Sequence, residues 1–452
     1  MPATYENFSS VSQTPRIRIC GRNKNNLMKK RNIALLAAAF AATIAVTVVV
    51  MNVSSGEKRV REQVEHRYTV ADPQFVRVMG VLLGPALVGG NRVETLLNGD
   101  RIFPSMLQAI RSATKTITFE TYIYWSGEIG KAFAEALSER ARNGVRVHVI
   151  LDWVGSQKMD EDALAAMRKA GVEIEQYHPP GWYTINRMNN RTHRKLLVVD
   201  GRIGFTGGVG IADKWSGNGQ DAEHWRDTHY RIEGPAVAQM QATFTDNWTK
   251  TTGRILHTED YFPPLKPVGS QYAQVFQSSV EGGAESMHLM YLLSIAAATR
   301  TIHLSMAYFA PDEAALQTLV DAVKRGVKVQ LILPGPISDA QLVQSSSRAK
   351  WGELLGLGAE IHQYQPTMFH CKVLVVDGLW TSVGSTNFDS RSFRLNDEAN
   401  LNVYDKDLAA RQIADFENDL KKSRRVTYEE WASRPWHEKL REHAASLLDA
   451  QL

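Results

Sequence analysis

The sequence HRKLLVVDGRIGFTGG begins at His193, and the related sequence HCKVLVVDGLWTSVGS begins at His370. Each contains a histidine, a lysine two residues later, a run of leucine and valine, and an aspartate followed by glycine. The aliphatic run predicts a β-strand, in which alternate side chains share one face. The histidine and lysine therefore project together, whereas Cys371 points away and is expected in the core. Asp200 and Asp377 are expected to close each strand into a turn, as scaffolding acceptors more than as direct participants in chemistry.

Two further pairs of segments match in the same order along the chain. ATKTITFETYIYW from Ala113 matches ATRTIHLSMAYFA from Ala298, and GVRVHVILD from Gly144 matches GVKVQLILP from Gly326. The separations between copies are similar for all three pairs. Such an internal repeat indicates a duplication, so the sequence predicts two domains of the same kind.

Each copy of the repeat reads as strand, helix, strand, loop and strand. In the first copy, ITFETYIY and VRVHVIL are predicted strands, and residues 129–143 between them have the apolar spacing of a helix. The second copy repeats this pattern, with its helix over residues 312–325. Alternating strands and helices predict an α/β architecture with helices on both faces of a largely parallel sheet. We expect a first domain at residues 91–256, a proline-bearing linker at 257–270, a second domain at 271–425 and a helical tail at 426–452.

The run IALLAAAFAATIAVTVVVM, at residues 33–51, contains no charged residue. At about 1.5 Å per residue, a helix of this length crosses the hydrocarbon core of a bilayer. Basic residues precede it in greater number than they follow it, and the more basic flank usually stays in the cytoplasm. A cleaved signal peptide is the alternative. We expect a cytoplasmic extension at residues 1–32, a single-pass anchor in a bacterial inner membrane at 33–53, a juxtamembrane connector at 54–90 and an extracytoplasmic body.

The composition is that of a globular protein, with 452 residues of which 44% are hydrophobic and 22% charged. A net charge of +4 suits an anionic substrate or surface, but it is too small for the basic footprint of a nucleic-acid-binding protein. The two cysteines exclude a disulfide framework. His224, Arg226 and His229 could join His193 around a metal, but no familiar zinc spacing supports this, so no metal and no cofactor are expected.

The duplicated histidine and lysine suit the cleavage of a phosphodiester bond. A neutral histidine can attack phosphorus and form a covalent intermediate, while a second, protonated histidine donates its proton to the leaving oxygen. Lys195 and Lys372 supply fixed positive charge for the non-bridging oxygens. An isolated histidine is more often structural, but two copies of the same spacing favour a catalytic pair.

These motifs resemble the HKD motifs of the phospholipase D superfamily, in which two copies build one site across a pseudo-twofold interface. The segments GGVGIADKW after the first motif, HWRDTHYRIEGPAV from His224, and GSTNFDSRSFRLNDEANL from Gly384 resemble the bacterial cardiolipin synthase branch, over roughly residues 90–425. The resemblance implies two tandem α/β/α domains and a metal-independent site, with His193 as nucleophile and His370 as general acid and base. The catalytic set so implied is His193, Lys195, Asp200, His370, Lys372 and Asp377.

The resemblance also implies which residues support the two histidines. A carboxylate orients each histidine in this superfamily; Glu398 matches the partner of His370, and Asp227 matches the partner of His193. For Asp227, an ion pair with Arg226 is the alternative. The expected substrate-binding residues are Asn387, Ser385, Gly207, Gly208 and Arg226, although the first repeat has Gly210 where the second has Asn387.

The implied activity is transfer of a phosphatidyl group from phosphatidylglycerol to a second head-group hydroxyl, which yields cardiolipin. A hydrolytic phospholipase D, a nuclease-type phosphodiesterase and an inactive scaffold are the alternatives. The expected partners are phospholipids and the membrane, with no nucleic acid; a need for an accessory protein is left open. A candidate lip through which a lipid enters is formed by Tyr124, Trp125 and the aromatic and basic residues at 177–191, with ordinary loop packing as the alternative.

Overall fold

The computed structural model describes residues 22–53, 60, 63–179, 189–279 and 286–447. The chain divides into two compact units, Met1–Ser54 and Ser55–Leu452. In the first unit, helix α1 (Arg22–Val53) contains a segment of 21 residues, Met28–Val48, that is long enough, and on average apolar enough, to cross a membrane. The predicted N-terminal helix of membrane-spanning length is therefore confirmed. Residues 1–21 of the predicted extension lie outside the described part of the chain.

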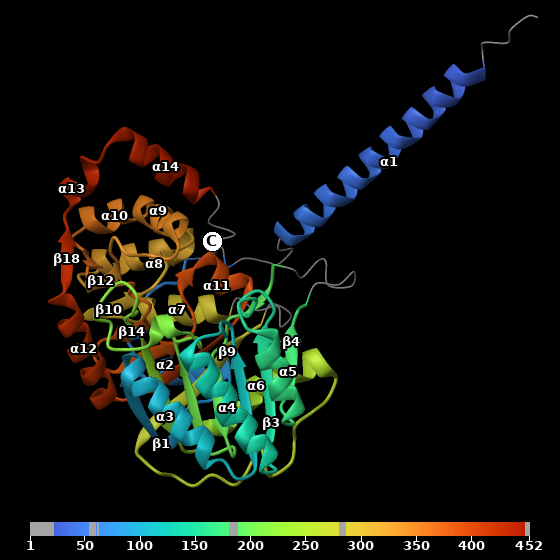
Figure 1. The fold of residues 1–452 in the computed structure, drawn as a ribbon. Coiled ribbons are helices and arrows are strands. Elements are labelled where there is room, and N and C mark those ends of the chain that lie inside the picture. Colours follow the sequence, from blue (N-terminus) through green and yellow to red (C-terminus); the bar gives the residue numbers. More distant parts are fainter. Residues whose placement is uncertain (1–21, 54–59, 61–62, 180–188, 280–285, 448–452) are drawn as a thin grey trace, which may run out of the picture. The chain divides into compact units, whose positions relative to one another are not determined.

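The second unit is built on one long sheet to which the two repeats contribute equivalent strands (Figure 1). From one edge to the other, the order is β18-β13-β12-β10-β14-β15-β17-β9-β1-β8-β7-β6-β2-β3-β4. Leaving β18 aside, the order is mirrored about the antiparallel pair β1–β9, where the two domains meet. This matched order is the pseudo-twofold arrangement of two tandem domains. The strands of the first domain are β1 (Val88–Leu97), β2 (Thr116–Thr121), β3 (Arg146–Asp152), β4 (Glu173–Tyr177), β6 (Leu196–Val199), β7 (Ile203–Gly207) and β8 (Thr228–Glu233). Those of the second domain are β9 (Gln271–Ser278), β10 (Thr301–Met306), β12 (Lys328–Pro334), β13 (Glu360–Tyr364), β14 (Lys372–Val376), β15 (Trp380–Gly384), β17 (Asn396–Tyr404) and β18 (Ser423–Val426).

The sheet is mixed, so the prediction of a largely parallel sheet was wrong. Only β2, β3 and β4 run parallel in the first domain, and β10, β12 and β13 in the second. The strand after each HKD histidine returns through a tight hairpin, because the Asp-Gly pairs Asp200-Gly201 and Asp377-Gly378 all have positive φ. Two consecutive residues of this kind form the turn that joins antiparallel strands.

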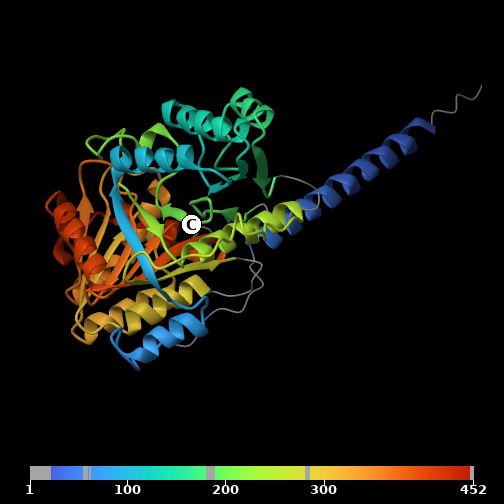
Figure 2. The same ribbon diagram turned by 90° about the horizontal axis from the view of Figure 1, so that it is seen from below.

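Helices cover both faces of the sheet (Figures 1 and 2). One buried cluster joins the first domain's strands to α3 (Asn98–Ser112), α4 (Glu128–Arg142) and α5 (Glu161–Lys169). A second joins the second domain's strands to α7 (Ser286–Ala296), α8 (Glu313–Lys324) and α10 (Trp351–Gly356). A third cluster lies on the opposite face of the sheet, where α6 (Val237–Thr252) and α12 (Lys406–Leu420) cover it. This cluster contains residues of both domains. The remaining elements are β5 (Arg191–Thr192), β11 (Phe309–Ala310), β16 (Phe388–Asp389), a 3-10 turn (Asp213–Trp215), α9 (Gln341–Ala349), α11 (Ser390–Arg394), α13 (Tyr428–Ala432) and α14 (Trp436–Ser446).

Within the region predicted as a connector, residues 54–90, the described segment 63–90 contributes to the body. Its helix α2 (Pro73–Val81) begins at an Asp72 cap whose side chain accepts a hydrogen bond from the backbone of Gln74. Phe75 and Met79 are buried in the second domain's core, where the Phe75 ring lies 5.0 Å from that of Trp380. Helix α2 therefore packs as part of the second domain, whereas residues 88–90 begin strand β1 of the first domain.

Candidate active site

The two HKD segments are each held by the opposite domain. The backbone N–H of His193 donates to the carbonyl of Asp397, 2.9 Å away, and that of His370 donates to the carbonyl of Arg226, at 2.8 Å. The short strand β5, directly before His193, runs parallel to the start of β17 in the second domain. Both histidine side chains are almost completely buried. His193 and His370 therefore both lie at the domain interface.

The carboxylates that orient the histidines are exchanged between the domains. Nδ1 of His193 lies 2.9 Å from Oε1 of Glu398, and Nδ1 of His370 lies 2.7 Å from Oδ2 of Asp227. The resemblance supplied the right carboxylates but the wrong partners, since it paired Glu398 with His370 and Asp227 with His193. The backbone pairing at the domain interface explains this exchange. Strand β17, which carries Glu398, pairs with β5 just before His193, and the backbone of Arg226 pairs with that of Phe369, just before His370.

Each carboxylate has a second hydrogen-bond partner. The Ser385 hydroxyl donates to Oε2 of Glu398 at 2.5 Å, and Nε1 of Trp215 donates to Oδ2 of Asp227 at 2.9 Å. Ser385 was expected at the substrate, but its hydroxyl is directed to Glu398 instead. The aromatic partner Trp215 was not anticipated, although it belongs to the GGVGIADKW segment that follows the first motif.

Gly207 and Gly208 make room for this arrangement. A Cβ on Gly208 would lie 2.1 Å from Oδ1 of Asp227, and one on Gly207 would lie 2.6 Å from the Cα of His229. Both glycines were expected to bind substrate. The structure indicates instead that glycine is needed here for space. A larger residue at position 208 would displace the Asp227 carboxylate, and one at position 207 would displace the strand at His229.

The two lysines lie beside their histidines. Nζ of Lys195 donates to the carbonyl of His193 at 2.8 Å, and Nζ of Lys372 donates to that of His370 at 2.9 Å. Both side chains are buried, so their charges act in a medium of low dielectric constant. The sequence-based placement of histidine and lysine on one strand face is consistent with these contacts.

A tyrosine accompanies each half-site, and sequence analysis overlooked both. The Tyr122 ring lies 5.2 Å from the His193 ring, and Nζ of Lys195 lies 5.7 Å from its centroid. The Tyr308 ring lies 6.2 Å from that of His370, and its hydroxyl donates to Asp339 at 2.7 Å. Both tyrosines come just after the first strand of their repeat, in segments that had been read only as strand ends.

Burial, together with nearby charges, shifts the pKa values of both histidines and of Glu398. It lowers the pKa of His193 well below its usual value, and the charges of Lys195 and Lys372 act in the same direction. Burial also lowers the pKa of His370, with Lys372 assisting, but ionised Asp227 opposes this shift. The pKa of Glu398 is raised by burial.

Asp227 shows the opposite balance. Burial would raise its pKa, yet the charges of His370 and Lys372 and the hydrogen bond from His370 hold that pKa below the usual value. Asp227 is therefore the ionised carboxylate of the pair, and it favours the protonated form of His370. The two half-sites are thus electrostatically unequal.

Asp200 and Asp377 have the scaffolding contacts expected from the sequence. The Asp200 carboxylate accepts hydrogen bonds from the backbone N–H groups of Thr114, Lys115 and Thr116. Asp377 makes the same three contacts with residues 299–301 in the second repeat. Each aspartate therefore fastens the turn after the HKD strand to the start of the neighbouring strand.

Asn387 and Cys371 differ in what surrounds them. The Asn387 side chain is buried, and its Oδ1 has no hydrogen-bond partner in the part of the chain that the structure describes. It therefore stays a candidate for contact with a phosphate. Cys371 lies in a small core cluster with Phe369 and Phe416, which confirms the expected core position.

Arg226 does not have the position expected of a substrate ligand. Its Nη2 and Nε bind the two carboxylate oxygens of Asp419 at 2.7 and 3.0 Å, and its Nη1 donates to the carbonyl of Asp227 at 2.7 Å. Neighbouring residues of an extended segment point to opposite sides, so Asp227 faces His370 while Arg226 faces α12. The structure assigns Arg226 to the domain interface.

Replacing Arg226 tests this correction. We expect Arg226→Met to destabilise the protein by about 3 kcal/mol, because it leaves the Asp419 carboxylate buried without its partner. The double variant Arg226→Met/Asp419→Leu should recover much of this loss. The thermal midpoint of the detergent-solubilised protein measures both effects. A variant with an unchanged midpoint but a raised KM for lipid would instead return Arg226 to the substrate site.

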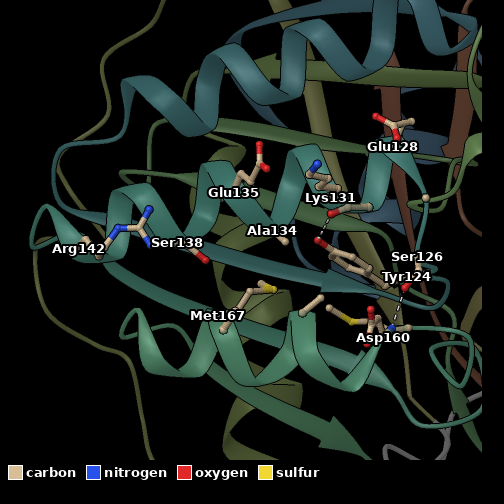
Figure 3. Close-up of a pocket in the computed structure, with 15 residues that line it drawn as sticks. Tyr124, Ser126, Glu128, Lys131, Ala134, Glu135, Ser138, Arg142, Asp160 and Met167 are labelled. Atoms are coloured by element: carbon tan, nitrogen blue, oxygen red, sulfur yellow. Dashed lines mark hydrogen bonds between the residues drawn. The ribbon is translucent and has the colours of Figure 1, made fainter.

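A separate cavity of about 510 Å³ lies between α4 and α5 (Figure 3). Tyr124, Ala134 and Met167 line it, with Lys131 and Arg142 at its rim. Its described lining residues include neither His193 nor His370.

Within the described ranges, no group of three histidine, cysteine or acidic residues has the arrangement of a metal site. Nδ1 of His224, a candidate metal ligand by sequence, lies 2.7 Å from Oδ1 of Asp221. Residues 180–188 of the candidate lip lie outside the described ranges.

Comparisons with known proteins identify the family. The model of the family "Cardiolipin synthase, PLD-like domain" matches residues 106–248 and 291–420, one segment in each repeat. This chain belongs to that family. A cardiolipin synthase of Geobacillus kaustophilus is 35% identical over 365 residues, which cover 80% of this chain and 72% of the relative. The major cardiolipin synthase of Bacillus subtilis is 34% identical over 361 residues, or 79% of this chain and 75% of the relative.

A solved structure shares the fold of this cardiolipin synthase family member. Phosphatidylserine synthase of Haemophilus influenzae superposes with a TM-score of 0.62 over 80% of this chain and 95% of its own. Its sequence identity is 14%, so the likeness concerns the fold alone. The family match therefore confirms the resemblance of the two HKD motifs to the phospholipase D superfamily.

Proposed function

We propose that this protein is a cardiolipin synthase that moves a phosphatidyl group from one phosphatidylglycerol to the head-group hydroxyl of a second phospholipid. The observation that carries the proposal is the pair of buried histidine–lysine half-sites, each completed by a carboxylate from the other domain. The relatives named as cardiolipin synthases support this choice of substrate. The chain is thus an enzyme of the phosphatidyltransferase type.

In the first half-reaction, Nε2 of His193 attacks the phosphorus of phosphatidylglycerol. Nδ1 is bound to Glu398, so Nε2 is the nitrogen free to react. A bond forms between nitrogen and phosphorus, and the bond between phosphorus and the glycerol oxygen breaks. Protonated His370 gives its Nε2 proton to that oxygen. The products are glycerol and phosphatidyl-His193.

In the second half-reaction, His370 is neutral and accepts a proton from the incoming hydroxyl. The hydroxyl oxygen attacks phosphorus, and the bond to Nε2 of His193 breaks. The products are cardiolipin, free His193 and protonated His370, which is ready for another cycle. If water takes the place of the hydroxyl, the product is phosphatidic acid. Exclusion of water from the acceptor site therefore separates the synthase from a hydrolytic phospholipase D.

The electrostatic environments support the assignment of His193 as nucleophile. A nucleophilic histidine must be neutral, and burial together with two lysines lowers the pKa of His193 strongly. A general acid must be protonated, and ionised Asp227 favours the proton on His370. Two titratable groups with environments that separate their pKa values are suited to the two roles.

Lys195 and Lys372 would stabilise the negative charge that develops on the non-bridging oxygens. Asn387 would add a hydrogen bond from its side-chain amide. These groups supply positive charge and donors from the protein itself, so we propose that the reaction needs no metal. The unequal half-sites, with Asn387 in one and Gly210 in the other, would orient the phosphate in one direction only.

The apolar helix α1 would hold the enzyme at its lipid substrates as a single-pass anchor. Basic residues are more frequent before it than after it, so we propose that the N-terminus is cytoplasmic and the catalytic body extracytoplasmic. The small net charge and the membrane helix speak against a nuclease-type phosphodiesterase.

A lipid assay tests the proposal. Purified full-length protein in mixed micelles with phosphatidylglycerol and a chelator should yield cardiolipin and glycerol, separated by thin-layer chromatography. Phosphatidic acid as the sole lipid product would change the assignment to a hydrolase. Activity that appears only when a divalent cation replaces the chelator would contradict the metal-independent mechanism. Absence of any turnover under all conditions would favour the scaffold reading.

A further inference from the structure

Surface helices usually turn apolar side chains toward the core and charged ones toward solvent. The C-terminal helix α14 instead buries a glutamate and exposes large apolar side chains. Glu442 and Ala445 are buried against the body, with 1% and 2% exposure, and α14 packs along α9. Trp436, Leu440 and Leu447 are 75%, 60% and 75% exposed. At about 100° per residue, these three side chains lie within about 40° of one another on the outer face. Helix α14 lies at the outside of α9 and α10 in Figure 1.

The inward face of α14 is fixed by ion pairs. The Glu442 carboxylate binds Arg434 at 2.7 Å and lies 3.4 Å from Nε of Arg348 on α9. Glu438 lies 3.5 Å from the same arginine. Both acidic residues of the helix are therefore engaged with the body. Because the inward face is held by these contacts, the apolar stripe on the outer face is a stable feature of the surface.

The charge left at the surface of α14 is positive. Lys439 and Arg441 are both exposed, and they lie on the two sides of the apolar stripe. Five residues earlier in the chain, Trp431 points inward, where its Nε1 donates to the carbonyl of Arg348. The two tryptophans therefore have opposite environments, and only Trp436 offers its ring to the exterior.

We propose that this stripe, formed by Trp436, Leu440 and Leu447, is a docking surface for an anionic phospholipid bilayer. Tryptophan and leucine on one face of a helix, with cationic residues beside them, are the features of helices that lie in a membrane interface. The same chain carries helix α1, which is long and apolar enough to cross a membrane and, in the function proposed above, would hold the body at a lipid surface. The surface is separate from the catalytic histidines and goes beyond the proposed function.

Site-specific labelling tests the proposal in the full-length protein. In a Cys20→Ser background, Leu440→Cys is labelled with a bimane fluorophore; Cys371 is 1% exposed and stays unlabelled in the folded protein. The matched control is Ile255→Cys, since Ile255 is 64% exposed on a loop of the other domain. The protein is reconstituted into vesicles of phosphatidylcholine, with or without phosphatidylglycerol.

We expect brominated acyl chains to quench the label at position 440 several-fold more than the label at 255, and more strongly when phosphatidylglycerol is present. Equal quenching of both labels by aqueous iodide would overturn the proposal. Protection of position 440 in detergent that rises with protein concentration would also overturn it, because a second copy would then cover the stripe.

The double variant Trp436→Ser/Leu440→Ser supplies a second measurement. We expect several-fold lower turnover on phosphatidylglycerol vesicles but unchanged turnover on short-chain phosphatidylglycerol in detergent, because only the bilayer contact is lost. Equal loss in both assays would contradict the proposal. The labelling experiment does not require turnover, so failure of the proposed function leaves this test intact.

Discussion

We expect His193→Ala to lose turnover by about 10⁴-fold or more, because the proposed covalent route through this histidine would no longer exist. His370→Ala loses turnover of phosphatidylglycerol as well, but for a different reason. Without a general acid, glycerol is a poor leaving group. A donor in which p-nitrophenol replaces glycerol needs no proton on departure, so it separates the two roles.

With that donor, we expect His370→Ala to release one equivalent of nitrophenolate in a burst and then stop as phosphatidyl-His193. His193→Ala should show no burst. Rapid mixing with absorbance detection measures the burst, and mass spectrometry of the denatured protein locates the adduct. A burst in His193→Ala and none in His370→Ala would reverse the roles of the two histidines. Wild type provides the reference for both.

Asp227→Asn lowers kcat by about 10³-fold or more, since loss of the ionised partner of a catalytic histidine has effects of this size. Its effect on pH dependence is more specific. Asp227 raises the pKa of His370 against the lowering effects of burial and Lys372. Removing the negative charge therefore lowers that pKa. Because His370, as the proposed general acid, would act in its protonated form, the high-pH limb of the kcat/KM profile should move to lower pH.

This measurement also tests the exchange of carboxylates. If Asp227 were the partner of His193, which must be neutral to attack, its replacement would move the low-pH limb instead. Asp221→Asn is the matched control, since Asp221 is an exposed carboxylate that contacts His224 and neither catalytic histidine. We expect its pH profile to match that of wild type. Glu398→Gln should cost less than Asp227→Asn, because burial already raises the pKa of Glu398 toward its neutral form.

The sequence determined much of the fold because its evidence was local and repeated. Two copies of the same strand with the same histidine, lysine and Asp-Gly turn predicted the duplicated domains, the shared face and the scaffolding contacts of Asp200 and Asp377. The Asp-Gly pairs also contained the evidence for hairpins, and hence for a mixed sheet. Helix α2 had a local signal too, an aspartate followed by proline at residues 72–73.

The exchange of carboxylates could not be predicted in the same way. Glu398 is 205 residues from His193 in the sequence, and no pattern near either residue states which strand edges meet. Arg226 is a different case, because the alternation of an extended segment already placed it and Asp227 on opposite sides. Only the position of α12 showed that the side facing away from His370 contains an acidic partner for Arg226.

The crossing of Glu398 and Asp227 between the domains has a consequence for the nascent chain. When the first domain leaves the ribosome, His193 is present but its carboxylate has not yet been synthesised. Asp227 has been synthesised too, but its partner His370 has not. Neither half can therefore assemble a carboxylate-bound histidine by itself, and we expect a truncated or partly synthesised protein to be inactive. We therefore expect turnover of lipid only after both halves have been translated and folded.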